Sequence, residues 1–106
     1  MNEISLNGRR YAYEDRGSGT PLLLLHGFPF SSESFWPQLE SPPNGFRVIA
    51  PDHRGFGGSA FGEGPSTMEA MAEDALGLLD ALKIPAAVVG GVSMGGYVAL
   101  ALARLD

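Results

Sequence analysis

Cysteine is absent from this 106-residue sequence, and basic residues are scarce. Without thiols the chain has no disulfide framework and no thiolate metal site, although this leaves its compartment open. Seven Lys and Arg residues stand against twelve Asp and Glu residues, which gives a formal net charge of −5. An acidic chain without a basic cluster is not expected to bind nucleic acid or an anionic membrane surface.

Long apolar runs and a basic leader are missing as well. The longest apolar run, Pro21 to Leu25, is far too short to span a bilayer. The first five residues, MNEIS, lack the basic and apolar regions of a signal peptide, so we expect a cytoplasmic protein with no membrane partner. The composition, 44% hydrophobic and 18% charged, is that of a soluble globular protein. The length allows one domain at most, residues 1–106.

What the sequence does contain is an alternation of strand and helix patterns. Residues 4–7 and 11–14 alternate apolar with polar side chains around Asn7-Gly8, which predicts an antiparallel hairpin. Three further runs are apolar on nearly every residue, which is typical of parallel strands covered on both faces: 22–25, 47–50 and 86–90.

Helices are expected between and after these parallel strands. The clearest begins at Ser66 with the capping-box sequence STME and keeps a helical apolar spacing to Leu82, before Pro85. A shorter helix is expected over 34–39, and a last, Ala/Leu-rich helix over 94–105. This order predicts an α/β fold in which an N-terminal antiparallel hairpin precedes a mostly parallel sheet.

The last strand–turn–helix unit carries the strongest chemical motif. Gly91-Val92-Ser93-Met94-Gly95 fits the G-x-S-x-G pattern, with a strand before it and a helix after it, as a nucleophile elbow requires. The two glycines leave room for a sharp turn that strains Ser93 and lifts its hydroxyl above the sheet. The helix N-terminus beneath the serine favours developing negative charge. A simple glycine-rich turn is the alternative interpretation.

A second motif, His26-Gly27-Phe28-Pro29, follows the strand at 22–25. An acyl-transfer site needs two backbone amides aimed at one point. Met94, the residue after the serine, supplies one N–H, and Phe28 is the natural candidate for the other. We interpret His26 as an imidazole that anchors its loop by binding backbone groups, and direct catalysis by His26 is the alternative.

A third motif, PDHRGFGGS at residues 51–59, follows the strand at 47–50. Asp52 beside Arg54 is compatible with general-base chemistry. The interpretation that we prefer is that the charges and glycines of this segment hold a long loop beside the site. His53 is interpreted in the same way.

In this order and spacing, HGFP, PDHRGFGGS and GGVSMGGY resemble the oxyanion loop, the D-x-R-G-x-G-x-S loop and the nucleophile elbow of the α/β-hydrolase fold superfamily. The resemblance covers essentially the whole chain and is closest to small esterases and enol-lactonases that use no cofactor and no metal. It implies Ser93 as the nucleophile of ester or lactone hydrolysis, with the amides of Phe28 and Met94 as the oxyanion hole. A serine at the elbow argues against the branches that use aspartate there, the haloalkane dehalogenases and epoxide hydrolases.

The catalytic triad that the resemblance implies is incomplete in these residues. In the superfamily an acid and then a histidine follow the serine, whereas Asp106 is the only acid and no histidine follows Ser93. Because a serine hydroxyl needs a base, we expect this piece of a hydrolase domain to be inactive or very weak by itself. One alternative is a non-catalytic assembly module that keeps the elbow only as a turn. Another is complementation by a C-terminal half supplied as a second polypeptide.

The resemblance also implies a truncated sheet in the order 1-2-4-3-5, with helices on both faces. The strand at 86–90 then lies at an edge, with unpaired backbone and an uncovered apolar face. We therefore expect a homo-oligomer, most simply a symmetric dimer. Four aromatic residues are candidates for an acyl pocket: Phe28, Phe30, Trp36 and Tyr97. Ordinary core packing is the alternative for each of them, and it is at least as strong an interpretation for Phe30 and Trp36.

Overall fold

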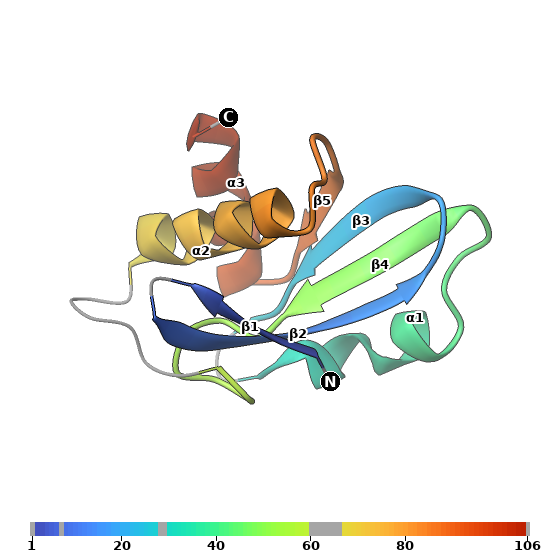
Figure 1. Cartoon of the computed structure of the whole chain (residues 1–106), viewed down its shortest axis with the longest axis horizontal. Coiled ribbons are helices and arrows are strands. Elements are labelled where there is room, and N and C mark those ends of the chain that lie inside the picture. Colours follow the sequence, from blue (N-terminus) through green and yellow to red (C-terminus); the bar gives the residue numbers. More distant parts are fainter. Residues whose placement is uncertain (1, 7, 28–29, 60–66, 106) are drawn as a thin grey trace.

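In a computed structural model of the chain, a single five-stranded sheet is flanked by helices (Figure 1). The structure describes residues 2–6, 8–27, 30–59 and 67–105. The strands are β1 (Asn2–Leu6), β2 (Arg9–Gly17), β3 (Thr20–Leu25), β4 (Phe46–Pro51) and β5 (Val88–Gly91). The helices are the 3₁₀ helix η1 (Ser32–Phe35) and the α-helices α1 (Trp36–Glu40), α2 (Met68–Ala81) and α3 (Met94–Leu105).

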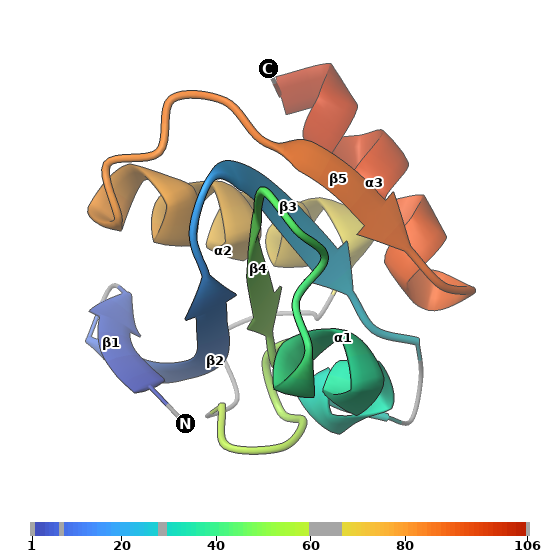
Figure 2. The same ribbon diagram turned by 90° about the vertical axis from the view of Figure 1, so that its right-hand side faces the viewer.

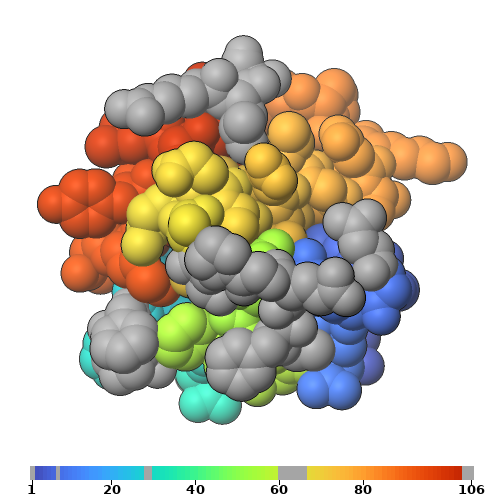
Figure 3. Space-filling model, turned by 90° about the vertical axis from the view of Figure 1, so that its left-hand side faces the viewer, coloured from blue at the N-terminus to red at the C-terminus, as the bar shows by residue number. Residues whose placement is uncertain are grey.

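The strands lie in the order β1-β2-β4-β3-β5, which confirms the predicted topology. β1 and β4 both run antiparallel to β2, whereas β3 runs parallel to β4 and to β5. Seen along the sheet, α1 lies on one face and α2 and α3 lie on the other (Figure 2). In Figure 3, α2 occupies the middle of its face, between α3 and the β1–β2 hairpin. The predicted α/β class, with helices on both faces, is therefore confirmed.

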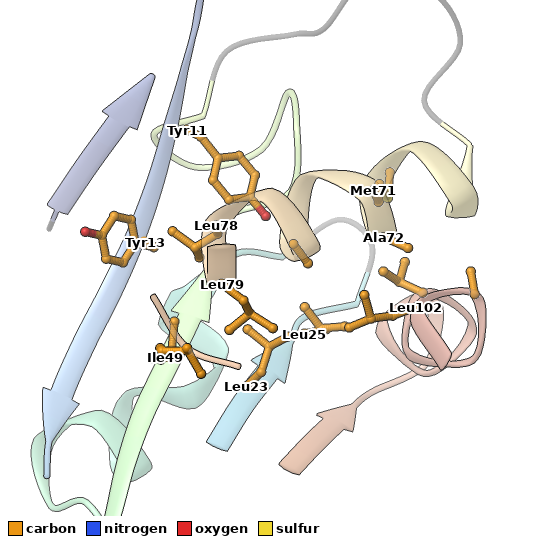
Figure 4. Packing of buried hydrophobic residues seen from close by; sticks show 14 residues of the cluster. Tyr11, Tyr13, Leu23, Leu25, Ile49, Met71, Ala72, Leu78, Leu79 and Leu102 are labelled. Atoms are coloured by element: carbon orange, nitrogen blue, oxygen red, sulfur yellow. The ribbon is translucent and has the colours of Figure 1, made fainter. Parts of the chain in front are cut away.

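Two apolar cores, one on each face, explain why the central strands are apolar on both sides. Successive residues of a strand point to opposite faces. In β4, Ile49 belongs to the large core beneath α2 and α3, whereas Val48 and Ala50 belong to a smaller core beneath α1. In β3, Leu23 and Leu25 belong to the large core, where Figure 4 shows them facing side chains of α2 and α3. Each fully buried aliphatic side chain contributes about 1.5–3 kcal/mol.

The ends of α2 differ in detail from the expectation. Its N-cap is Thr67, whose hydroxyl accepts the N–H of Ala70 at 3.0 Å, so the helix begins one residue later than predicted. Ser66 lies outside the described residues. At the other end, Lys83 takes a left-handed conformation, with φ of 60°, and the N–H of Ile84 binds the carbonyl of Leu79 at 2.9 Å. This is a Schellman motif, and it ends the helix before Pro85 is reached.

The shorter elements also shift slightly. The helix expected over 34–39 is η1 followed by α1, with Pro37 in the first turn of α1. β5 begins at Val88, two residues later than predicted, because its pairing with β3 starts opposite Leu22. The helix predicted over 94–105 is α3.

Candidate active site

The turn between β5 and α3 presents Ser93 to solvent. Ser93 has φ of 55°, in the left-handed region, which costs a residue with a Cβ roughly 1–2 kcal/mol. The turn is fixed to the neighbouring strand because the N–H of Val92 donates to the carbonyl of Leu25 at 3.1 Å. The carbonyl of Ser93 in turn accepts the N–H of Gly96 at 2.9 Å. Ser93 itself is exposed, so the strained backbone holds an accessible hydroxyl at the carboxyl end of β5.

The two glycines of the motif are required by close backbone contacts. A Cβ on Gly95 would collide with the carbonyl oxygen of Leu25 and would lie 2.8 Å from that of His26. A Cβ on Gly91 would collide with the backbone of Gly95 and lie 2.6 Å from the nitrogen of Gly96. Neither glycine has a positive φ, so steric room is the physical reason for both.

Of the two amides expected to form an oxyanion hole, the structure describes one. Met94 is the first residue of α3, and helix geometry leaves the N–H of that position without an intrahelical acceptor. Phe28 lies outside the described residues, so its role stays a prediction. The preceding residue is described: a Cβ on Gly27 would lie 3.0 Å from the oxygen of Val92 and 3.4 Å from the Cβ of Ser93. The loop after β3 therefore contacts the elbow at Gly27.

His26 is fully buried, and both of its ring nitrogens bind backbone groups. Its Nε2 accepts the N–H of His53 at 2.9 Å. A neutral ring must then carry its proton on Nδ1, which lies 2.9 Å from the carbonyl oxygen of Gly27 and donates to it. Burial lowers the pKa of His26, which keeps the ring neutral at pH 7. Because its lone pair is occupied, this imidazole has no free acceptor for the proton of Ser93.

His53 is also fully buried, against the ring of His26, and the two ring centroids are 4.3 Å apart. Burial, and then the neighbouring imidazole, lower the pKa of His53 from 6.5 to about 4. Within the part of the chain that the structure describes, neither ring nitrogen of His53 has a hydrogen-bond partner. Its backbone N–H, by contrast, makes the bond to His26.

Asp52 connects the loop at 52–59 to η1 and, through Ser59, to β2. Its carboxylate accepts the N–H of Ser32, in η1, at 2.6 Å and the N–H of Gly58 at 3.0 Å. Its backbone carbonyl accepts the hydroxyl of Ser59 at 2.6 Å, and this hydroxyl accepts the N–H of Ala12, in β2, at 2.8 Å. Both carboxylate oxygens thus bind backbone amides, which gives Asp52 a loop-holding position.

Arg54 is held by Asp74 of α2, a residue that was not predicted from the sequence. Its Nε and one terminal nitrogen each lie 2.8 Å from an oxygen of Asp74, and Arg9 binds the same carboxylate at 2.7 Å. Because the guanidinium donates hydrogen bonds to the Asp74 carboxylate, the pKa of Arg54 is raised above its ordinary value. A sequence signal was present, because Asp74 falls between Met71 and Leu78 on the apolar face of α2. A carboxylate buried on such a face needs a cationic partner.

Three of the four candidate pocket aromatics are described, and all three are exposed. Phe30 is 61% exposed, Trp36 45% and Tyr97 66%, so the core-packing alternative is wrong for all three. The guanidinium of Arg16 lies over the Trp36 ring, 5.5 Å from its centroid. Tyr97 lies one helical turn after Ser93, where its N–H approaches the Ser93 carbonyl at 3.4 Å. Tyr97 is therefore the described aromatic tied most directly to the elbow.

Among the described residues, no three His, Cys, Asp or Glu side chains gather closely enough to hold a metal ion. No described helix combines the length and apolar character that a bilayer crossing requires. The His26 imidazole and the Asp52 carboxylate instead bind backbone groups of the loops.

Most of the chain matches one family of known proteins. The family described as the alpha/beta hydrolase fold matches residues 20–106. The chain belongs to the α/β-hydrolase fold family. The match spans the strand–turn–helix unit of Ser93 and the loops after β3 and β4.

Individual α/β-hydrolase relatives agree with this membership. The chain is 38% identical over 88 residues to the AB hydrolase superfamily protein YisY of Bacillus subtilis, covering 82% of this chain and 33% of that protein. A thermophilic esterase of Thermogutta terrifontis superposes with a TM-score of 0.90 at 45% identity, covering 98% of this chain and 41% of the esterase. The N-acyl homoserine lactonase AidH superposes with a TM-score of 0.89 at 37% identity, covering 97% of this chain and 40% of the lactonase.

The relatives differ from this α/β-hydrolase chain in length and from one another in chemistry. The chain spans about a third of the length of the first curated relative and about two fifths of the two solved structures. Other relatives are named as an epoxide hydrolase and a non-heme haloperoxidase. Family membership therefore leaves the reaction to be argued from the site.

Proposed function

We propose that this chain supplies the nucleophile of a serine hydrolase that cleaves carboxylic esters or lactones through an acyl-enzyme on Ser93. The observation that carries the proposal is the strained, exposed Ser93 between β5 and the N-terminus of α3. The esterase and the lactonase among the similar structures support this class of substrate. Another relative is named as an epoxide hydrolase. A serine at the elbow favours acyl transfer over the opening of an epoxide.

In the proposed reaction, Oγ of Ser93 adds to the carbonyl carbon of the substrate while a base removes its proton. The carbonyl oxygen becomes an oxyanion, which the N–H of Met94 and the predicted N–H of Phe28 stabilise. The bond between the carbonyl carbon and the alcohol oxygen then breaks, and the alcohol leaves with the proton. Water adds to the acyl carbon in the same way, releases the carboxylic acid and regenerates Ser93.

We further propose that the 106 residues alone react very slowly, because their two histidines do not serve Ser93 as a base. The lone pair of His26 is occupied by the N–H of His53, and His53 is fully buried. Loss of the histidine from an assembled triad lowers kcat on the order of 10⁶-fold. A second polypeptide that supplies the missing acid and histidine is expected to restore activity.

Chemical rescue tests both parts of this proposal. The chain is treated with a fluorophosphonate probe, with and without added imidazole, and the modified residue is identified by mass spectrometry. We expect slow labelling alone and faster labelling with imidazole, at Ser93, because imidazole replaces the absent base. Ser93→Ala gives the blank, and Ser34→Ala, which removes another exposed serine, should label like the original chain.

Two results would contradict the proposal. If imidazole does not accelerate labelling of Ser93, the elbow is only a turn. If the chain alone turns over a short-chain ester faster than about 1 s⁻¹, the low end of ordinary enzyme rates, and Ser93→Ala abolishes this, a base is already present.

A second candidate function is that of a self-assembling module, and the exposed edge of the sheet favours it. β5 pairs only with β3 among the described residues. Val88, Val92 and Leu100 are 52%, 58% and 64% exposed on and beside this edge. We propose that the 106 residues alone form a symmetric dimer there, because unpaired strand edges with apolar neighbours bind other chains. A monomeric mass in sedimentation at micromolar concentration, without ANS binding, would rule this out.

A further inference from the structure

Two buried imidazoles lie in contact beneath the elbow, and the proposed hydrolysis uses neither of them. The rings of His26 and His53 are tilted by 49° to one another, with centroids 4.3 Å apart. The rings of Phe56 and His26 form a T-shaped pair, with centroids 5.7 Å apart. Both histidines are 0% exposed, so any proton that they bind must enter a buried, partly aromatic site.

We propose that His26 and His53 form a proton-sensitive latch that keeps the loop after β3 against the elbow. The latch is closed, with the loop in this position, only while both rings are neutral. The latch depends on the 2.9 Å hydrogen bond in which Nε2 of His26 accepts the backbone N–H of His53. A second proton on the His26 ring would occupy Nε2 and place two N–H donors face to face. Protonation therefore converts this bond into a repulsion.

The latch reaches Ser93 through Gly27. The other nitrogen of His26 donates to the Gly27 carbonyl, and this residue packs so closely on the elbow that its Cβ would lie 3.4 Å from the Cβ of Ser93. Movement of the His26 ring thus moves Gly27, which packs against the elbow. His26 is a positioning residue in this arrangement, and its bond to His53 sets the protonation state in which it works.

The charged groups around the pair are committed elsewhere. Asp52, after β4, binds backbone amides, and Asp74, in α2, binds the guanidinium of Arg54. Tyr11, in β2, is neutral because burial, followed by the charges of these two carboxylates, raises its pKa. Both carboxylates raise the pKa of His53, but burial lowers it more strongly. A proton on the pair would therefore lack a dedicated counter-ion among the described residues.

The pH window follows from the two states of the chain. An unfolded histidine binds a proton near pH 6.5, whereas His53 in the folded chain binds one only near pH 4. The unfolded state thus binds more protons as the pH falls from about 6.5 to about 4, and the free energy of unfolding decreases across this interval. Above pH 6.5 both states are neutral at this site, and the latch is closed.

Nitrogen-edited NMR of the histidine rings tests the latch directly in the 106-residue chain. At pH 7 we expect His26 as the Nδ1–H tautomer, with Nε2 shifted as a hydrogen-bond acceptor. As the pH is lowered, the ring signals of His53 should stay neutral to below pH 5 and then change together with the ring signals of His26 and the backbone amide signals of Gly27 and His53. Independent ring titration near pH 6.5, with no change in these amides, would overturn the proposal, as would the Nε2–H tautomer.

His53→Phe provides the matched variant, because it keeps the backbone N–H that binds His26 but cannot bind a proton. Between pH 7 and pH 4.5 the unfolding midpoint of this variant should fall less than that of the original chain. The difference in the pH slope should correspond to about one proton fewer taken up on unfolding. Glu33→Gln, which removes an exposed acid of η1, is the control and should retain the original slope between pH 7 and pH 5. Equal slopes for His53→Phe and the original chain contradict the latch. If the variant does not fold, the ring titration of the original chain decides alone, and no readout depends on hydrolysis.

Discussion

The turn after β5 and the loop after β4 lie at the same end of the sheet, beyond the carboxyl ends of the strands, because β4 and β5 both run parallel to β3. These two segments are built in different ways. The turn is exposed, carries no charged side chain and holds Ser93 through backbone hydrogen bonds and glycine contacts. The loop buries Asp52, His53 and Arg54. Asp52 accepts two backbone N–H groups, and Arg54 makes two hydrogen bonds to the carboxylate of Asp74. The reactive hydroxyl is thus presented by backbone geometry, while side-chain bonds hold the scaffold beside it.

The largest effect is expected from adding one methyl group to the elbow. Gly95→Ala places a Cβ against the carbonyl oxygens of Leu25 and His26, which cannot move without breaking the end of β3. We expect a loss of about 4 kcal/mol or more in the free energy of unfolding, measured in urea, or failure to fold. Gly96→Ala is the matched control, because its Cβ would lie an ordinary 3.7 Å from the Gly91 oxygen. Equal stability of the two variants would show that the turn is not sterically constrained.

The loop should respond nearly as strongly to removal of its buried carboxylate. Asp74→Ala leaves the guanidiniums of Arg54 and Arg9 buried without their partner, so we expect a loss of about 3–5 kcal/mol. Glu73→Ala, at the adjacent exposed position, should change stability by no more than about 0.5 kcal/mol. Chemical denaturation measures both, and a loss below about 1 kcal/mol for Asp74→Ala would mean that side-chain bonds do not hold this loop.

A smaller effect is expected at the exposed edge of the sheet. Val88→Lys places a charge on the proposed dimer contact, and two such charges face each other across a symmetric interface. We expect the dimer to weaken by at least about tenfold, equivalent to about 1.4 kcal/mol, in sedimentation equilibrium. Gln38→Lys, on exposed α1, adds the same charge away from the edge and should leave the association unchanged.

The smallest effect separates strain at the elbow from strain elsewhere. Ser93 and Lys83 are the two described residues other than glycine with a positive φ. Either Ser93→Gly or Lys83→Gly should stabilise the chain by about 1 kcal/mol in thermal unfolding, because glycine tolerates this conformation. Only Ser93→Gly should abolish imidazole-assisted labelling. If Ser93→Gly is destabilising, the left-handed conformation of Ser93 is not strained.

Much of the fold followed from local patterns. The apolar runs in β3 and β4 predicted strands buried on both faces, and the two cores on opposite faces account for them. The element order and α3 were also predicted correctly, and the sheet order was predicted correctly by the resemblance to the α/β-hydrolase fold. The start of α2 was not, because Ser66 and Thr67 are both good N-caps and sequence spacing alone does not choose between them. The same limit applies to β5, whose first residue is set by its pairing with β3.

The partners of the buried polar groups could not be predicted in this way. The bond from His53 to His26 joins residues 27 positions apart, and the ion pair of Arg9 with Asp74 joins residues 65 positions apart. A buried polar group needs a partner because desolvation is costly, but this requirement does not say which distant segment will provide it. Asp74 on an apolar helix face was a visible sign of such a need, whereas nothing in the sequence pointed to the contact between the two imidazoles.

By itself the sequence determined the properties that depend on neighbours a few residues away: the helical and strand periodicities, and a glycine-flanked turn that leaves Ser93 at its tip. These are local because backbone sterics and apolar spacing act over one or two turns of chain. Only the tertiary structure decided that His26 gives its lone pair to His53, that Asp52 binds amides of η1 and its own loop, and that Arg54 shares Asp74 with Arg9. These pairings arise when the sheet brings distant segments to one edge and removes water from between them.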